Sequence, residues 1–251
     1  MKRAELVTYL DDYLRINEIA DYGPQGLQVE ADNETIRRIG LAVDVSPAII
    51  EAAASWGADM LLVHHGILWR DVERIAGPLG QRVRRLLAHG INLYAAHLPL
   101  DAHPEVGNNA QLAQMLGVEV DQWWCVPKDT PVGVLGTVKT AVSLAQFVDQ
   151  IDDQLAIKAR VLAHGPEQVN RVAIVSGFGA DQAAEAHALG ADTFVTGETS
   201  HAHYWAAADY GFNMIYAGHY ATETVGVKAL GQHLTGQFDL EVNFFDFPTK
   251  M

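Results

Sequence analysis

Leu61-Leu62-Val63-His64-His65-Gly66 is an apolar run that ends in two adjacent histidines and a glycine. The apolar part is typical of a short buried strand. Adjacent strand residues point to opposite faces, so both imidazoles can serve one site only if the backbone turns there, as Gly66 permits. Ligand sites form beyond strand ends in open α/β sheets, and imidazole binds zinc, iron, nickel and copper. The pair indicates either a metal site or a hydrogen-bonded histidine pair at a strand end.

The sequence around this stretch predicts a βαβ unit. Ser46 is a typical N-cap, Pro47 suits a first helical turn, and Gly57 suits a helix end. Apolar periodicity then gives the remaining elements of the first part. They are a helix at 3–16, a strand at 36–43, a helix at 48–56, a strand at 59–63, a helix at 80–89, a strand at 91–96 and a helix at 108–116.

The end of the chain repeats the pattern of its beginning. Arg38 lies nineteen positions before the glycine of Gly57-Ala58-Asp59, and Arg171 lies nineteen positions before that of Gly190-Ala191-Asp192. Self-similarity at a fixed spacing is the mark of internal repeats, although two unrelated βαβ units also share patterns. We favour duplication and expect an α/β fold of two similar lobes with a metal cleft between them. The expected divisions are a first α/β lobe at 1–117, a short α+β connecting segment at 118–170 and a second α/β lobe at 171–251.

Composition narrows the classes of protein. The chain has 251 residues, 49% of them hydrophobic, with 31 acidic and 17 basic residues and a formal net charge of −14. Such a balance opposes binding to a nucleic-acid backbone. No apolar run has the length of a membrane span, and the first residues do not resemble a signal peptide. The single Cys125 excludes an internal disulfide. We expect a cytoplasmic protein.

Polar side chains cluster at the expected strand ends. Imidazoles mixed with carboxylates suit iron, manganese, zinc or nickel better than calcium or magnesium. The candidate ligands are too many for one tetrahedral ion and about enough for two. Two such ions together activate water for hydrolysis. The candidates are His64, His65, His97, Asp101, Glu198, His219 and Glu223.

The two pairs in which an acid follows a histidine by four positions differ in their expected setting. Pro99 lies between His97 and Asp101, which places that pair on a loop. His219 and Glu223 can share one face in the first turn of a helix. Glu198 is expected to orient a histidine.

The chain resembles the Nif-three-like proteins, the YbgI group, known as GTP cyclohydrolase type 2 homologs. The matching stretches are Asp21-Tyr22-Gly23-Pro24-Gln25-Gly26-Leu27-Gln28-Val29, Val63-His64-His65-Gly66, His97-Leu98-Pro99-Leu100-Asp101, Gly107-Asn108-Asn109, Thr196-Gly197-Glu198 and Gly218-His219-Tyr220-Ala221-Thr222-Glu223. The resemblance implies a two-lobed α/β fold, a dinuclear metal site between the lobes and a toroidal homo-hexamer. Carried over by motif, the metal ligands are His64, His65, Asp101, His219 and Glu223. His97 matches a family histidine beside the site, as ligand or as neighbour.

These observations lead to a functional hypothesis. We expect a dinuclear hydrolase that uses two divalent metal ions per subunit on a small phosphorylated or nucleotide-like substrate. His97 is the candidate general acid or base, because histidine titrates near neutrality. The alternative is a non-enzymatic metal-binding or regulatory ring-shaped assembly. A ring associated with nucleic acid is a third reading, against which the acidic balance counts.

Overall fold

The computed structural model describes residues 1–70 and 74–249. They form two compact units, and the chain visits the first of them twice. Unit 1 comprises Met1–Leu100 and Gly226–Phe247. Unit 2 comprises Asp101–Val225 and the short stretch that begins at Pro248. Among the described residues, none of the helices is both long and apolar enough to cross a membrane.

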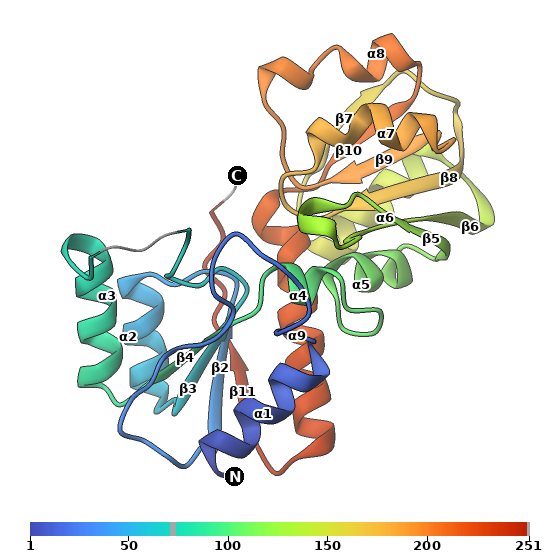
Figure 1. Cartoon of the computed structure of the whole chain (residues 1–251). Helices are drawn as coiled ribbons and strands as arrows, with labels where there is room; N and C mark the ends of the chain where they lie inside the picture. Colours follow the sequence, from blue (N-terminus) through green and yellow to red (C-terminus); the bar gives the residue numbers. More distant parts are fainter. Residues whose placement is uncertain (71–73, 250–251) are drawn as a thin grey trace. The chain divides into compact units, whose positions relative to one another are not determined.

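A five-stranded sheet forms the centre of unit 1, in the order β1-β4-β3-β2-β11 (Figure 1). Strands β11, β2, β3 and β4 run parallel, and β1 is antiparallel to β4. All residues of β3 and β4 are buried, as expected for parallel strands that are covered on both faces. The bounds are β1 (Gly26–Val29), β2 (Arg38–Ala42), β3 (Met60–Val63), β4 (Asn92–Ala95) and β11 (Glu241–Phe244).

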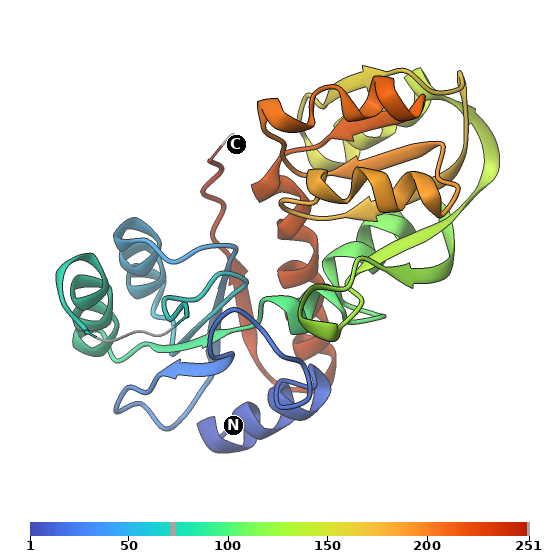
Figure 2. The same ribbon diagram turned by 45° about the horizontal axis from the view of Figure 1, so that its top comes forward.

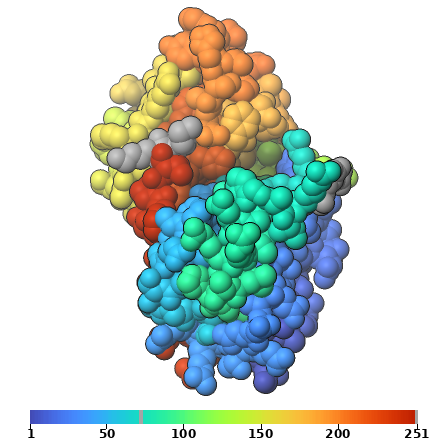
Figure 3. All heavy atoms as spheres, turned by 90° about the vertical axis from the view of Figure 1, so that its left-hand side faces the viewer, coloured from blue at the N-terminus to red at the C-terminus, as the bar shows by residue number. Residues whose placement is uncertain are grey.

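Helices cover both faces of this sheet. On one face, α2 (Pro47–Trp56) and α3 (Gly77–Ala88) lie side by side (Figure 3). On the other lie α1 (Arg3–Tyr13) and the part of α9 (His219–Gln237) that belongs to unit 1. There Gly231 of α9 approaches β2 so closely that an added Cβ would collide with Leu41.

The local signals at the ends of α2 were read correctly from the sequence. The Ser46 side chain accepts a hydrogen bond from the Ile49 N–H, and Pro47 is the first helical residue. Gly57 ends the helix in the left-handed conformation, with φ of 80°. This short helix is therefore fixed between β2 and β3 by its own sequence.

Unit 2 contains a six-stranded sheet in the order β5-β6-β8-β9-β10-β7. Strands β8, β9 and β10 run parallel, whereas β5, β6 and β7 pair antiparallel with their neighbours. The bounds are β5 (Val118–Trp124), β6 (Gly133–Ser143), β7 (Arg160–Ala163), β8 (Gln168–Val175), β9 (Thr193–Thr196) and β10 (Asn213–Tyr216).

Helices also lie on both faces of the second sheet. Residues of α5 (Asn108–Met115) and α6 (Leu144–Leu155) share one apolar core with β8, β9 and β10. Helices α7 (Ala183–Ala188) and α8 (Ala206–Tyr210) lie on the opposite face (Figure 2). The remaining short elements are α4 (Leu98–Asp101), η1 (Pro127–Asp129), η2 (Ala180–Gln182) and η3 (His201–His203).

The two units repeat one order of elements. The series α1-β1-β2-α2-β3-α3-β4 corresponds to α6-β7-β8-α7-β9-α8-β10, and the strand order β1-β4-β3-β2 corresponds to β7-β10-β9-β8. The same side-chain contacts recur. Asp59 accepts hydrogen bonds from the N–H groups of the first residue of β2 and the residue before it, and Asp192 does so from Asn170 and Arg171. This correspondence supports an internal duplication.

The compact units do not follow the expected divisions after residues 117 and 170. Residues 118–170 are not a separate segment, because β5, β6 and β7 belong to the same sheet as β8, β9 and β10. They also contain α6 and β7, which open the second repeat. Moreover, the repeats exchange their last helices: α5 follows β4 but packs in unit 2, whereas α9 follows β10 but enters unit 1 from Gly226 on. Each unit is thus completed by a helix of the other repeat.

Candidate metal site

Three histidines of unit 1 meet at the carboxyl ends of β3 and β4. His64 and His65 follow β3 directly, and His97 follows β4. One possible ligand atom from each lies within 4.8 Å of those of the other two. The backbone bends at His64 and His65, directly after β3, as expected. Gly66 lies so close to the Gln28 side chain that an added Cβ would collide with its amide. The turn brings both imidazoles of the adjacent pair into one group.

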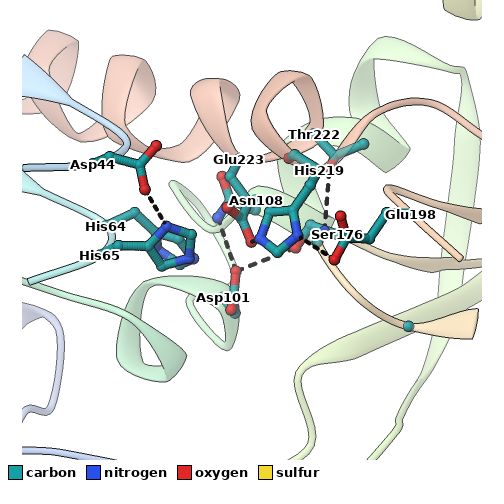
Figure 4. A network of polar contacts seen from close by, with 12 residues as sticks. Asp44, His64, His65, Asp101, Asn108, Ser176, Glu198, His219, Thr222 and Glu223 are labelled. Carbon is teal, nitrogen blue, oxygen red and sulfur yellow. Dashed lines mark hydrogen bonds and ion pairs between the residues drawn. The ribbon is translucent and has the colours of Figure 1, made fainter. Parts of the chain in front are cut away.

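All three imidazoles have their Nδ1 atoms bonded to an oxygen acceptor. His64 Nδ1 lies 3.0 Å from the Ala96 carbonyl, His65 Nδ1 lies 2.9 Å from Asp44 (Figure 4), and His97 Nδ1 lies 2.8 Å from Asp21. Carbonyl and carboxylate oxygens only accept, so each Nδ1 carries a proton, and in a neutral ring the lone pair is then on Nε2. Histidines that bind metals are held by acceptors in this way.

Residues 21–28, a loop that leads into β1, hold the histidine-bearing segments in place. Asp21 accepts from the Leu98 N–H as well as from His97, and Gln25 accepts from the His97 N–H. Gln28 accepts from the Ile67 N–H at 2.7 Å, next to Gly66. This segment is therefore part of the candidate site.

Sequence reasoning missed Asp21 and Asp44 as partners of the histidines. A signal for Asp44 was present, because it follows β2 at the same sheet edge as His65 follows β3. No comparable signal exists for Asp21, which lies in an irregular loop before β1.

In unit 2, His219 lies between two carboxylates. His219 and Glu223 occupy the first turn of α9, as expected, with 3.0 Å between His219 Nε2 and Glu223 Oε1. Glu198 follows β9, and its Oε1 lies 3.2 Å from His219 Nδ1 (Figure 4). Only a residue without a side chain fits at Gly177, whose added Cβ would collide with Glu223. Glu198 thus contacts a histidine, as its position suggested.

The electrostatics of this group favour a positive charge. Burial lowers the pKa of His219, but the hydrogen bonds and charges of Glu223 and Glu198 outweigh burial and raise the pKa to about 9. The imidazole is therefore a cation at neutral pH and stands where two carboxylates stabilise positive charge. A metal ion at these carboxylates would satisfy the same electrostatic requirement.

Asp101 lies at the end of α4 and is 7% exposed. Its Oδ1 accepts hydrogen bonds from Asn108 Nδ2 at 2.8 Å and from Ser176 Oγ at 3.2 Å (Figure 4). The expectation of a loop from His97 to Asp101 was wrong, because Leu98–Asp101 forms one helical turn. Pro99 is compatible with it, since N–H groups in a first helical turn have no intrahelical partner.

The chemistry of these groups fits a transition metal. They offer imidazole nitrogens and carboxylate oxygens, which suit iron, manganese, zinc and nickel. The histidine group belongs to unit 1, whereas Asp101, His219 and Glu223 belong to unit 2. The cleft that would join them in one dinuclear site remains a prediction.

Fold and side chains together define a class of two-unit α/β proteins with groups able to hold a metal ion. The chain belongs to the Duf34/NIF3 (NGG1p interacting factor 3) family, whose model matches residues 1–250. The resemblance drawn from the sequence motifs is therefore confirmed.

Curated relatives match along nearly the whole chain. A Deinococcus radiodurans protein named GTP cyclohydrolase 1 type 2 homolog is 43% identical over 249 residues, which cover 99% of this chain and 94% of the relative. The Escherichia coli K12 protein of the same name is 40% identical over 250 residues, with 99% of each chain covered.

Solved structures of similar sequence share the fold. The protein ybgI, described as of unknown function, is 39% identical with a TM-score of 0.93, and both chains are covered completely. A Thermus thermophilus protein is 42% identical with a TM-score of 0.92, again with complete coverage of both chains. The α/β fold class expected from the sequence is confirmed.

Proposed function

We propose that this protein is a hydrolase that depends on divalent metal ions and acts on a small phosphorylated or nucleotide-like substrate. The main support is the group of three imidazoles, which lie close together and are each bonded through Nδ1 to an oxygen acceptor. Such a group is pre-organised, since the rings are already in the orientation that a metal ligand requires. The name of the relatives, GTP cyclohydrolase 1 type 2 homolog, suggests nucleotides as the first substrates to test.

The proposed centre holds two ions of iron, manganese, zinc or nickel per subunit. Its ligands are His64, His65, Asp101, His219 and Glu223. When bound, divalent ions supply Lewis acidity that polarises a substrate bond and activates water. Asn108 and Ser176 hold the Asp101 carboxylate, while Asp44 holds the His65 ring.

His97 is the proposed general acid or base. Asp21 accepts a hydrogen bond from Nδ1, which leaves Nε2 of the neutral ring as the atom that can accept a proton from a reacting group. Proximity to His64 and His65 also suits His97 as a further ligand. His97→Ala separates the two roles: loss of bound metal identifies a ligand, whereas loss of turnover with normal metal content identifies an acid or base.

The first experiment measures metal content in protein purified without added metal. We expect Asp101→Ala and Glu223→Ala each to lower bound metal strongly, while circular dichroism shows an intact fold. Asp32→Ala, which removes an exposed carboxylate, is the control and should keep the wild-type metal content. Normal metal content in both site variants would remove these carboxylates from the centre.

The second experiment tests turnover. Metal-loaded protein is screened against nucleotides, with GTP included, and against phosphate monoesters. Hydrolysis that is lost in Glu223→Ala and kept in Asp32→Ala supports the hydrolase. Two results together would support the non-enzymatic assembly instead. The metal-loaded protein would hydrolyse none of these substrates, and its ions would have no open coordination position.

A further inference from the structure

A small cavity lies within unit 2, apart from the metal-ligand candidates but close to them in the chain. Its volume is about 190 Å³. The side chains around it are mostly hydrogen-bond donors, and one carries a positive charge. Those used below are Arg160, Thr199, Ser200, Tyr204 and Tyr216.

The cavity lies at the carboxyl edge of the parallel strands of unit 2. Tyr216 is the last residue of β10, and Arg160, the first residue of β7, pairs with it in the sheet. Thr199 directly follows Glu198, so their Cα atoms are about 3.8 Å apart across the peptide bond. Glu198 contacts His219 in turn. A ligand in the cavity would therefore lie beside the candidate metal ligands of unit 2.

Arg160 is one of the arginines of this acidic chain whose guanidinium is not held by an acidic side chain. Several others are paired with a carboxylate, for example Arg171 with Asp121 and Arg85 with Glu51. The Arg160 guanidinium instead lies 6.0 Å from the centre of the Tyr204 ring, and among the described residues it has no carboxylate partner. In a chain with a net charge of −14, such a guanidinium is left for an anion from outside.

The donors around the cavity suit a tetrahedral anion. A guanidinium binds two phosphate oxygens side by side, and hydroxyl groups can serve the remaining ones. Thr199 and Ser200 now bond within their own loop, to the Ser200 carbonyl and to His203, and their hydroxyl groups can rotate toward a ligand. Burial raises the pKa of Tyr216, so its hydroxyl stays a neutral donor at physiological pH. A carboxylate, with two oxygens, would leave part of this donor set unused.

The size of the cavity limits what it can take. Pockets for whole small-molecule ligands have volumes of about 300–1,000 Å³. A cavity of about 190 Å³ therefore takes one end of a ligand. The rest would extend past Tyr204 and Trp205, two neighbouring rings that are 37% and 62% exposed and pack edge to face. Exposed aromatic rings in this place can stack on a sugar or a base.

We propose that this cavity binds the phosphate group of a phosphomonoester, with Arg160 as the anchor. The phosphate is a handle that positions the ligand, and the reacting part lies toward Glu198 and His219. The identity of this ester as the substrate rests on the proposed function, whereas phosphate binding in the cavity does not. Binding energy from a group that does not react is a common means of positioning a substrate.

Calorimetric titration of the full-length, metal-loaded protein with inorganic phosphate and with ribose 5-phosphate tests the proposal. We expect Arg160→Ala to weaken both affinities at least about tenfold, since hydrogen bonds to charged groups contribute that much or more. Arg160→Lys keeps the charge but loses the paired geometry and should be intermediate. Arg37→Ala, which removes another exposed arginine, should match the wild type. Melting curves check that each variant is folded.

Glu223→Ala distinguishes this site from phosphate held by the metal ions. We expect it to lower metal content and to leave phosphate affinity unchanged. Phosphate binding that is lost in Glu223→Ala but kept in Arg160→Ala would overturn the proposal. Equal affinity of the wild type for acetate and for phosphate would also overturn the proposal. The same holds if the wild type binds inorganic phosphate but not ribose 5-phosphate, or if it binds no phosphate. Metal content in the same samples reports separately on the proposed function.

Discussion

At the scale of single residues, the most informative contacts are those between histidines and distant acceptors. His65 bonds Asp44, and His97 bonds Asp21. A carboxylate at Nδ1 fixes the orientation of the ring and makes Nε2 more basic, which strengthens its bond to a metal. In the proposed centre, Asp44 and Asp21 would therefore orient His65 and His97.

Asp44→Ala should weaken metal binding without removing any ligand. We expect the metal dissociation constant to rise about 10- to 100-fold, the usual effect of losing such a partner. Asp44→Asn keeps an acceptor oxygen and should lose less. A titration against a competing chelator measures the affinity, with Asp32→Ala as the control. Unchanged affinity in Asp44→Ala would show that the orientation of His65 does not matter to the metal.

The sequence revealed the histidines but only some of their partners. His64, His65 and His97 stand out because apolar strand patterns end just before them. Asp21 does not, since it meets His97 across 76 positions of the chain and has no regular element around it. Contacts of this kind depend on the folded arrangement, which local patterns do not encode.

At the scale of elements, the close approach of β5 and β6 explains why position 136 is a glycine. Gly136 of β6 lies opposite Val120, next to an irregularity in the register of β5. An added Cβ would collide with the Glu119 carbonyl oxygen, a backbone atom that cannot rotate away. The sheet of unit 2 therefore depends on the absence of a side chain at this position.

Gly136→Ala should lower the free energy of unfolding by about 1–3 kcal/mol, the usual cost of overpacking. Gly236→Ala is a matched control in the last turn of α9, where nothing lies within 4 Å of an added Cβ. We expect that change to be neutral or to stabilise by up to about 1 kcal/mol, because alanine favours a helix. Urea unfolding measures both, and equal stability of the two variants would contradict the assignment.

The turn after α6 provides a dependence of stability on pH. The Asp152 side chain is 6% exposed and accepts hydrogen bonds from Lys158 and from the Ala159 N–H. Burial raises its pKa, but these hydrogen bonds and the lysine charge together lower the pKa below its ordinary value. A carboxyl group with a lower pKa in the folded state stabilises the protein above its unfolded pKa and loses that effect as pH falls.

Asp152→Asn should therefore lower the melting temperature at pH 7. The difference from the wild type should shrink as pH falls from about 4, the ordinary aspartate value, through the lower folded pKa. Asp153→Asn, in the same helix but exposed, is the control. A difference that is constant from pH 7 to pH 3 would contradict the role of the carboxylate charge.

Element prediction succeeded where local signals were strong. The cap of α2, with Ser46, matches the expected helix start. It failed for β7, which is short and pairs antiparallel at the edge of its sheet, so that α6 and β7 were assigned to a connecting segment. Membership of a sheet depends on pairing between strands that are distant in the chain. The local patterns in residues 118–170 do not predict that pairing.

At the scale of the whole molecule, the family resemblance predicts a ring of six chains. Light scattering at micromolar concentration should give a mass near six times the 27.3 kDa of the chain. Metal-free protein provides a useful comparison, since it shows whether assembly needs the ions. A mass near that of one chain would contradict the expected homo-hexamer.

The exchange of last helices between the repeats has a consequence for synthesis on the ribosome. Unit 1 needs Gly226–Phe247, which includes β11, the parallel neighbour of β2. These residues emerge only after Asp101–Val225 has been made, which takes roughly 6–25 s at about 5–20 residues per second. During that interval one edge of β2 has no partner strand, and the face around Leu41 has no α9. The nascent chain therefore exposes apolar surface that a chaperone can bind, until residues 226–247 have emerged.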